Sequence, residues 1–391
     1  MNSVIPQIKC IGADDDNIGI FEGQYPIPGG ISYNSYFIED EHIAVVDSVD
    51  VRRCGDWLAS LKHSLGTSGR SPEYLIVQHM EPDHSGSVMA LMESYPEVKI
   101  VCTQMAACML SNYFESVDFT DRLHIVKEGD TLCLGRVTLR FITAPMVHWP
   151  EVMMTFDETD GVLFSADAFG TFAMSSGAVG DAWDAEARRY YTNIVGRFGA
   201  NVQSLMKKLG GLKFSIVAPL HGPVLKEDLA HYWQLYDKWS RYEPETRGVL
   251  VAYASIYGGT AEAARQIAAE LRSEDAGEVV LMDLCRHDVS YAVAEAFRLS
   301  HLVLCSVTYD CSLFPAMHEF LHHIECKKLS GRRVALVENG SWSPMAARLM
   351  AEPLSRMKDM EVIEPVLSIR SRLHQTDFPC LRELVRNLMK Q

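Results

Sequence analysis

The sequence predicts an α/β protein of two domains, an N-terminal αββα sandwich followed by a five-stranded parallel doubly wound sheet. Three observations support this prediction. The chain has 391 residues and is 48% hydrophobic, which is more than a typical single domain needs. Short strand-like runs dominate its first part, whereas strands and helices alternate strictly in its last part. A short charged segment that contains a proline, 241–247, separates the two patterns.

The predicted sandwich occupies residues 1–245. Strand-like runs lie at 31–38, 42–47, 74–77, 99–102, 137–142, 152–156, 162–165 and 215–220. Helical patterns lie at 51–65 and 85–94, and two longer ones follow at 185–209 and 226–242. Many strands with helices at their flanks indicate two stacked sheets covered by helices.

The second domain, 248–391, follows the charged segment. Strands are expected at 248–255, 278–284, 301–307, 333–338 and 361–369. The expected helices lie between and after them, at 261–272, 291–298, 315–325, 344–358 and 380–390. Strict alternation of strand and helix is typical of a doubly wound parallel sheet.

Composition excludes several classes of partner. The formal net charge of −15 argues against nucleic acid and against anionic membranes. The N-terminal residues lack the basic start and apolar core of a signal peptide, and no apolar run is long enough to span a bilayer. The ten cysteines form no Cys-x-x-Cys pair, which excludes an in-chain rubredoxin or zinc ribbon. We therefore expect a cytoplasmic protein with reduced thiols.

Residues 79–84 read His-Met-Glu-Pro-Asp-His and follow a predicted strand directly. A tight turn at Pro82 would point four side chains into one cavity: His79, Glu81, Asp83 and His84. Two imidazoles and two carboxylates are more than one ion usually takes, so the segment suggests a two-metal centre. A solvated polar turn is the alternative, and the ligands available downstream argue against it.

Three further candidate ligands follow later strands of the same domain: His148, Asp167 and His221. Each stands where a buried strand gives way to a loop, which is where sheet-based sites collect ligands. Taken singly, a histidine at such a place is often structural and an aspartate is often a helix cap. The order of these elements along the chain favours one shared metal site.

A second motif, Ser-Ile-Tyr-Gly-Gly-Thr at 255–260, lies between a predicted strand and a predicted helix. Hydroxyls at both ends and two central glycines let backbone N–H groups close around a phosphate at a helix N-terminus. The loop lacks the lysine of Gly-x-x-x-x-Gly-Lys-[Ser/Thr], so a nucleoside triphosphate fits poorly. It is not Gly-x-Gly-x-x-Gly, so a dinucleotide fits poorly as well. It resembles the flavodoxin loop that holds the FMN monophosphate.

Two more loops, 306–311 and 339–343, follow the third and fourth strands of that sheet. In a doubly wound sheet they lie with the first loop at the carboxyl edge near the topological switch point, where ligands bind. Aromatic residues could stack on a flavin there, although ordinary surface aromatics are the alternative. The candidate FMN-binding residues are Ser255, Ile256, Tyr257, Gly258, Gly259, Thr260, Ser306, Thr308, Tyr309, Asp310, Gly340, Ser341 and Trp342.

The metal motif resembles that of the metallo-β-lactamase superfamily, His-x-His-x-Asp-His followed by His, Asp and His. One position departs from it, because Glu81 stands where hydrolases have their second histidine. A carboxylate adds negative charge and a harder oxygen ligand, which favours iron over zinc. This variant is the mark of the flavodiiron proteins, and the chain resembles them over essentially its whole length. The third flavin loop, 340–344, looks shorter than the family's usual Gly-Ser-Tyr-Gly-Trp type.

By that resemblance, one iron takes His79, Glu81 and His148, and Asp167 bridges to the second. The second iron takes the other three ligands: Asp83, His84 and His221. Two ferrous ions and one reduced FMN hold four electrons, enough to reduce O2 to water and more than the two that turn two NO into N2O. The sequence leaves the choice between the two gases open. Electrons must come from an external donor, such as rubredoxin or a flavin reductase.

Two other classes of function stay open at this stage. One is a metal-dependent hydrolase of the metallo-β-lactamase superfamily with an appended electron-transfer flavodoxin domain, against which Glu81 argues. The other is an electron carrier with an inactive metal site, against which the complete ligand set argues. The family resemblance also implies a head-to-tail homodimer or a dimer of dimers, in which the FMN of one chain serves the iron of the other.

Overall fold

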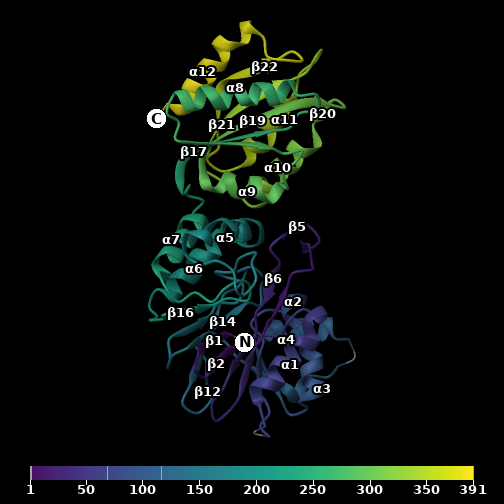
Figure 1. The fold of residues 1–391 in the computed structure, drawn as a ribbon, viewed down its shortest axis with the longest axis vertical. Helices are drawn as coiled ribbons and strands as arrows, with labels where there is room; N and C mark the ends of the chain where they lie inside the picture. The colour runs from purple at the N-terminus through teal and green to yellow at the C-terminus, as the bar shows by residue number, and fades with distance from the viewer. Residues whose placement is uncertain (1, 68, 116, 391) are drawn as a thin grey trace. The chain divides into compact units, whose positions relative to one another are not determined.

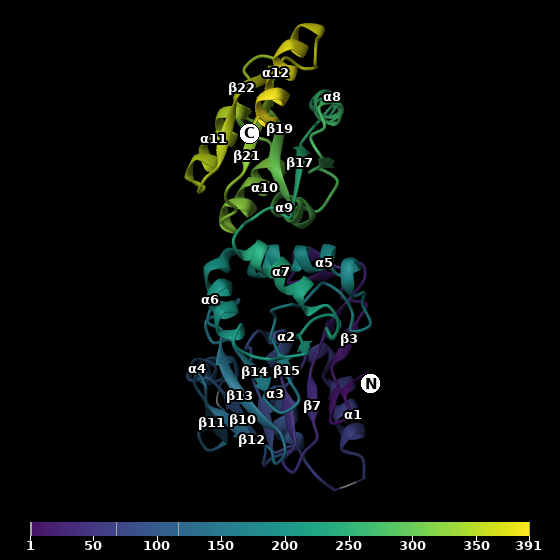
Figure 2. The same cartoon turned by 90° about the vertical axis from the view of Figure 1, so that its left-hand side faces the viewer.

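Two sheets pack face to face in the first part of the computed structural model, which describes residues 2–67, 69–115 and 117–390 (Figure 2). The first sheet has strand order β1-β2-β7-β8-β9-β10-β11. Its strands are β1 (Asn2–Ile5), β2 (Ile8–Cys10), β7 (Tyr36–Ile38), β8 (Ala44–Val46), β9 (Tyr74–Ile76), β10 (Lys99–Cys102) and β11 (Leu123–Ile125). The second sheet runs in chain order through β12 (Thr131–Cys133), β13 (Thr138–Thr143), β14 (Met153–Asp157), β15 (Val162–Phe164) and β16 (Ile216–Ala218). Apolar side chains of both sheets share one buried core.

Two short strand pairs and a set of helices complete this part of the chain. The pairs are β3 (Ala13–Asp15) with β6 (Ile31–Tyr33), and β4 (Ile20–Phe21) with β5 (Tyr25–Pro26). The helices are α1 (Cys54–Leu65), α2 (Pro82–Ser85), α3 (Val88–Ser94), α4 (Gln104–Tyr113), α5 (Asp184–Tyr190), α6 (Gly199–Leu209) and α7 (Leu229–Ser240). Of these helices, α1, α3 and α4 lie alongside the sheets, whereas α5 and α7 lie beyond one end of the strands (Figures 1 and 2). Sheets that bury one face against each other leave the other face for helices to cover.

The last part of the chain forms a parallel sheet in the order β18-β17-β19-β21-β22. Its strands are β17 (Thr246–Tyr253), β18 (Glu278–Asp283), β19 (Leu299–Tyr309), β21 (Arg333–Asn339) and β22 (Glu361–Ile369). The short β20 (Ser312–Leu313) pairs with β19 in an antiparallel hairpin. This is the flavodoxin-like strand order 2-1-3-4-5, and it confirms the predicted five-stranded parallel sheet.

Helices cover both faces of the parallel sheet (Figure 1). One core packs the sheet against α8 (Gly259–Ser273) and α12 (Phe378–Met389). The other packs it against α9 (Val289–Arg298), α10 (Pro315–Cys326) and α11 (Ala346–Arg356). Because both faces are buried, the central strands are continuous apolar runs, which is why their positions were predictable. Among the described helices, none is both long and apolar enough to cross a bilayer.

Two predicted elements of the first domain are wrong as single elements. The run 31–38 divides into β6 and β7, which belong to different sheets, because Asn34 between them turns to bond Pro219 and Gly222. The predicted helix 185–209 is interrupted between α5 and α6 by a π-helical turn, Tyr191–Val195, and a 3-10 turn, Gly196–Phe198. The sequence analysis also missed α4 and several short strands, namely β1 to β5, β11, β12 and β20 (Ser312–Leu313), because elements this short or of mixed composition give a weak periodic signal.

The chain groups into two compact units, Met1–Tyr191 with Ala200–Tyr236, and Thr192–Gly199 with Asp237–Gln391. Residues Thr192–Gly199, which include most of the turns between α5 and α6, and the end of α7 thus belong with the second unit. The domain limits read from the sequence, 1–245 and 248–391, stay a prediction about independent folding that separate expression of the two parts would check.

Arg332 is a buried cation that ties several segments of the second unit together. Its side chain donates to the carbonyls of Ala296 and Phe297, at the end of α9, and to those of Tyr242 and Ser330, at 2.8–3.1 Å. Within the described residues no carboxylate pairs with it. Burial lowers the pKa of Arg332 to about 10, so the side chain stays charged at neutral pH and complements the C-terminal end of the helix.

We expect Arg332→Met to lower the free energy of unfolding by roughly 2–4 kcal/mol, because it leaves several buried carbonyls without a donor. Urea titration followed by circular dichroism measures the change. Arg356→Gln, at an exposed arginine of α11, is the matched control and should leave the midpoint near the wild-type value. Coincident transitions for Arg332→Met and the wild type would show that the buried guanidinium is dispensable.

Candidate metal centre and flavin site

Loops that follow strands of both sheets bring the seven predicted metal ligands together. His79 follows β9, and the chain then enters α2, whose N-cap and body carry the next three: Glu81, Asp83 and His84. The other three follow β13, β15 and β16: His148, Asp167 and His221. The expected tight turn at Pro82 is instead the start of a four-residue helix, because proline suits the first helical position. The seven side chains form two groups.

One group comprises His79, Glu81, His148 and Asp167, whose ligand atoms lie within 4.8 Å of one another. Nε2 of His79 lies 3.2 Å from Oε2 of Glu81 and 3.7 Å from Oδ2 of Asp167. Nε2 of His148 lies 3.1 Å from the same glutamate oxygen and 3.0 Å from the same aspartate oxygen. Ligand atoms at about 2.0–2.2 Å from one ion lie roughly 3 Å apart, so these separations suit a shared ion.

The other group comprises Asp83, His84 and His221. Nε2 of each histidine lies 3.4 Å from Oδ2 of Asp83, and the two nitrogens are 3.0 Å apart. Asp167 reaches this group with its second oxygen, because Oδ1 lies 3.3 Å from Nε2 of His84 and 3.9 Å from that of His221. Asp167 thus presents one carboxylate oxygen to each group, which is the geometry of a carboxylate that two ions share.

Several buried atoms of these groups have no hydrogen-bond partner within the described residues: both carboxylate oxygens of Asp83, Oδ1 of Asp167 and Nδ1 of His84. Nδ1 of His221 lies 2.7 Å from the carbonyl of Ser32, so it carries the proton and leaves the Nε2 lone pair facing the group. Lone pairs and carboxylates that face one another in a buried site are costly unless a cation lies between them. The residues therefore fit two metal ions, and a nitrogen and oxygen donor set without thiolate is compatible with iron.

Two buried carboxylates that the sequence reasoning missed hold the start of the ligand loop. Oε1 of Glu151 accepts hydrogen bonds from Nδ1 of His79 and from the backbone N–H of Met80, both at 2.8 Å. Asp47 accepts from the backbone and side-chain nitrogens of Gln78, at 2.8 and 3.0 Å. Such partners fix the tautomer and orientation of a ligating ring. The available signal for Glu151 was a lone carboxylate directly before an apolar strand.

Facing charges set the protonation of the ligands. Burial by itself disfavours the ionised form of Glu81, but the facing imidazoles, His148 first, outweigh it and lower the pKa of Glu81 to about 2. Burial also disfavours the charged form of His84, and the carboxylates of Asp83 and Asp167 outweigh it and raise the pKa of His84 to about 9. The carboxylates are thus balanced by protons on imidazole, and a bound metal ion takes the place of those protons.

Aromatic rings enclose the second group. The ring centroids of Phe21, Tyr33 and Tyr190 lie 5.5, 6.0 and 5.6 Å from that of His221. The hydroxyl of Tyr190 is buried and has no hydrogen-bond partner in the part of the chain that the structure describes. Burial, and then the nearby Asp167 carboxylate, raises the pKa of Tyr190 well above its usual range, so the hydroxyl keeps its proton.

The carboxyl edge of the parallel sheet holds a cavity of about 640 Å³. It is lined by the loops after β17, β19 and β21, and by every predicted flavin residue except Gly258 and Ser306. Ser306 is buried in β19, and Gly258 lines a neighbouring cavity. Tyr257 and Trp342 are 99% and 88% exposed, so neither ring is held by the protein, and both are free to cover a planar ligand.

The backbone of the loop 255–260, at the N-terminus of α8, requires glycine at two positions. Gly258 is the N-cap of α8 at φ 91° and offers no side-chain cap, which leaves the first N–H groups of the helix available to an anion. A Cβ on Gly259 would lie 2.1 Å from the carbonyl oxygen of Ser371, so only glycine fits. Asn339 donates to Oγ1 of Thr260 and to that carbonyl, both at 3.1 Å. Asn339 and Ser371 line the cavity. The sequence analysis named the loop 339–343 without Asn339 as a binding residue, and it missed Ser371. The residues fit a flavin mononucleotide.

Comparison with known proteins agrees with this geometry. The family model described as ODP family beta lactamase matches residues 31–222. The anaerobic nitric oxide reductase flavorubredoxin of Pectobacterium carotovorum is 30% identical over 346 residues, which cover 86% of this chain and 68% of that one. Rubredoxin oxygen:oxidoreductase of Desulfovibrio gigas matches with a TM-score of 0.92 at 24% identity, over 99% of this chain and 97% of that one. The flavodiiron protein of Giardia intestinalis matches with a TM-score of 0.87 at 23% identity, over 99% and 95%.

These findings define the class of the molecule, a metallo-β-lactamase-like sandwich joined to a flavodoxin-like domain. The chain belongs to the flavodiiron protein family.

We expect Glu151→Ala to lower metal affinity by roughly 10- to 100-fold, because His79 loses the acceptor that orients its ring. Glu151→Gln keeps an acceptor oxygen and should lose less. Iron content after competition with a chelator measures both variants. Glu97→Ala, at an exposed glutamate, is the control. Full iron retention in Glu151→Ala would show that the carboxylate does not support the ligand.

We expect Thr260→Val to weaken FMN binding by roughly 1.5–3 kcal/mol, about ten- to a hundredfold, because a hydroxyl that faces a charged phosphate is lost. Thr260→Ser keeps the hydroxyl and serves as the matched control. Fluorescence titration of the apoprotein with FMN measures the affinity, and iron content should not change. Equal affinities for the valine and serine variants would remove Thr260 from the phosphate site.

Proposed function

We propose that this protein is a flavodiiron oxidoreductase that reduces NO to N2O, O2 to water, or both, at a non-haem di-iron site supplied with electrons by FMN. The observation that carries the proposal is Asp167, whose two oxygens face two groups of histidine and carboxylate ligands. A flavin-sized cavity in the same chain supports it. The names of two relatives, a nitric oxide reductase and an oxygen:oxidoreductase, agree with both gases as candidate substrates.

In this function the seven ligands hold the two ions. FMN and two iron ions together supply the four electrons that reduction of one O2 requires. The chain contributes position and protons. Tyr190, whose ring centroid lies 5.6 Å from that of His221, carries a buried hydroxyl without a partner among the described residues and is suited to donate a proton or hydrogen bond to the reacting gas. The rings around His221 limit the entry of water.

The hydrolase alternative finds less support. Glu81 lies 3.2 Å from one ligating imidazole and 3.1 Å from another, at the place where a hydrolase of this superfamily has a histidine. A hydrolase also has no use for a flavin cavity. An electron carrier with an inactive metal site would not need seven convergent ligands whose buried oxygens lack other partners.

Donor and assembly are further parts of the proposal. We infer an external electron donor, of the rubredoxin or flavin reductase type, because the flavin and the two ions have to be reduced again after each turnover. We also infer a head-to-tail homodimer, or a dimer of dimers, in which one chain's flavin serves its partner's metal site. Light scattering under assay conditions checks the assembly, and a fully active monomer would refute it.

We expect the purified protein to contain two irons and one FMN per chain. Anaerobic reduction followed by stopped-flow mixing with NO or with O2 should reoxidise the flavin, with N2O as the product from NO. Two zinc ions per chain, together with hydrolysis of a thioester or β-lactam, would establish the hydrolase instead.

The same assay examines Tyr190. Tyr190→Phe removes only the hydroxyl, so iron and FMN content should stay the same while kcat falls by roughly 10- to 100-fold, because the reacting gas loses a positioned proton or hydrogen-bond donor. Tyr113→Phe, at an exposed tyrosine, is the control. An unchanged kcat in Tyr190→Phe would show that the reacting gas takes its protons from solvent and not from Tyr190.

A further inference from the structure

Glu22 is a titratable residue close to the metal centre that the function proposed above does not use. It lies in the turn of the hairpin formed by β4 and β5, directly after the strand pair of Phe21 with Tyr25. The ring of Phe21 packs edge-on against that of His221, with centroids 5.5 Å apart. The turn that carries Glu22 therefore begins one residue from a side chain that contacts a metal ligand.

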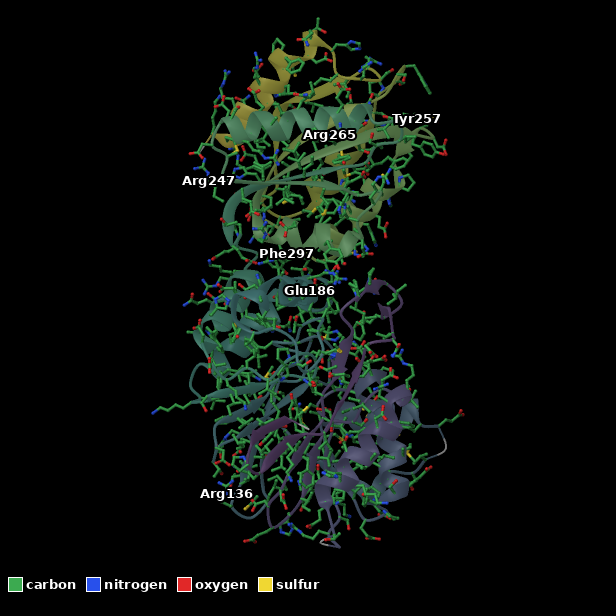
Figure 3. All side chains as sticks on the ribbon, in the orientation of Figure 1. Arg136, Glu186, Arg247, Tyr257, Arg265 and Phe297 are labelled. Atoms are coloured by element: carbon green, nitrogen blue, oxygen red, sulfur yellow. The ribbon has the colours of Figure 1, made fainter. Side chains whose placement is uncertain are left out.

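The hairpin is held in place by α5. Arg189, whose side chain is buried, donates hydrogen bonds to the carbonyl of Pro26 and to Oε2 of Glu186. Its guanidinium group also lies over the ring of Phe172, 4.8 Å from the centroid, and that ring packs on Phe21. β5 and α5 lie at the same end of the sandwich, where Figure 3 labels Glu186 (Figures 1 and 3). These contacts fix the position of the turn relative to the ligands.

The backbone of Glu22 adopts a conformation that is costly for a residue with a Cβ. Its φ is 49°, in the left-handed region, and the next residue, Gly23, has φ 69°. The backbone N–H of Gln24 donates to the carbonyl of Phe21 at 3.0 Å and closes the turn. Glycine or asparagine is the usual residue at such positions. Strained residues of this kind cluster at functional sites, which directs attention to the carboxylate that Glu22 carries.

Four metal ligands supply the charges that act on the Glu22 carboxylate: Glu81, His148, Asp83 and Asp167. Although the residue as a whole is exposed, protein atoms surround much of its carboxyl group. This burial, followed by the charge of Glu81, raises the pKa of Glu22 to about 7. Cations in the site would offset the ligand carboxylates but would leave the effect of burial. The carboxyl group thus faces the ligands while the residue keeps its contact with water.

The partners of this carboxylate leave its proton free to move. It accepts one hydrogen bond, from Nε2 of Gln24 at 3.4 Å, and no arginine or lysine of the described residues pairs with it. A proton donor works best when its pKa lies near the working pH. Tyr190 differs in this respect, because its pKa lies well above the usual range and it holds its proton more tightly. Glu22 is therefore better suited to release a proton at neutral pH.

We propose that Glu22 delivers protons from solvent to the gas that reacts at the metal centre. The inference rests on the proposed function and adds a proton donor to it. Reduction of one O2 to two waters takes up four protons with four electrons, and reduction of two NO to one N2O and one water takes up two of each. The electrons come from the reduced flavin and the two ions, as proposed above. The carboxyl group gives up its proton, and the resulting carboxylate regains one from water.

The test compares the wild type with Glu22→Gln and Glu22→Asp, and Glu97→Gln, at an exposed glutamate, is the control. Each protein is reduced anaerobically and mixed with O2 or NO at a series of pH values. The wild-type rate of flavin reoxidation should fall as the pH rises through about 7, because the carboxyl group is then ionised. Glu22→Gln should lower the rate at least tenfold below that pH and remove the pH step, whereas Glu22→Asp should restore part of both. Iron and FMN contents should match the wild type.

Infrared difference spectra of the same metal-loaded proteins, recorded without any gas, follow the carboxyl group directly. The carbonyl band of a protonated carboxyl group should disappear as the pH rises in the wild type and should be missing in Glu22→Gln. A band that Glu22→Gln leaves unchanged would overturn the proposal, as would an unchanged rate and pH profile. Loss of iron in both variants would also overturn it, because Glu22 would then support the ligands. Gas turnover by the wild type tests the proposed function separately, so it can succeed while this inference fails.

Discussion

The Asp167 carboxylate is the constraint on which the first unit depends. Its two oxygens face two groups of imidazole and carboxylate ligands, and all of these side chains except Glu81 are buried. Without cations, so many lone pairs and negative charges could not share one small space at acceptable cost. The shared carboxylate also offsets the repulsion that two adjacent cations would feel. The loops around it therefore have to be held where they are by the rest of the fold.

That support comes from the two sheets and from buried groups behind the ligands. Each ligand follows a strand whose own position is fixed by a core shared between the sheets. Glu151 holds the ring of His79, and the carbonyl of Ser32 holds that of His221, so both present a nitrogen lone pair to the site. The break between β6 and β7 belongs to the same arrangement, since Asn34 there bonds the backbone on both sides of His221.

The second unit follows a different rule, because its function lies at one edge of a single sheet. Strand order 2-1-3-4-5 places three loops at the carboxyl edge, and the uncapped N-terminus of α8 supplies the positive end of a helix to a phosphate. Arg332 has a structural role instead, because its guanidinium group donates hydrogen bonds to backbone carbonyls within the core.

The sequence by itself predicted the class of fold, the parallel sheet, the seven candidate ligands and most of the candidate flavin residues, because these depend on local periodicity, on motifs of adjacent residues and on positions directly after strands. Only the tertiary structure decided what depends on contacts between distant segments. Glu151 is 72 residues from His79, and Ser371 approaches Gly259 from more than a hundred residues away, so no local pattern reveals either. Gly199, the first residue of α6, also packs on a distant segment, because a Cβ there would lie 2.3 Å from the carbonyl oxygen of Ser240.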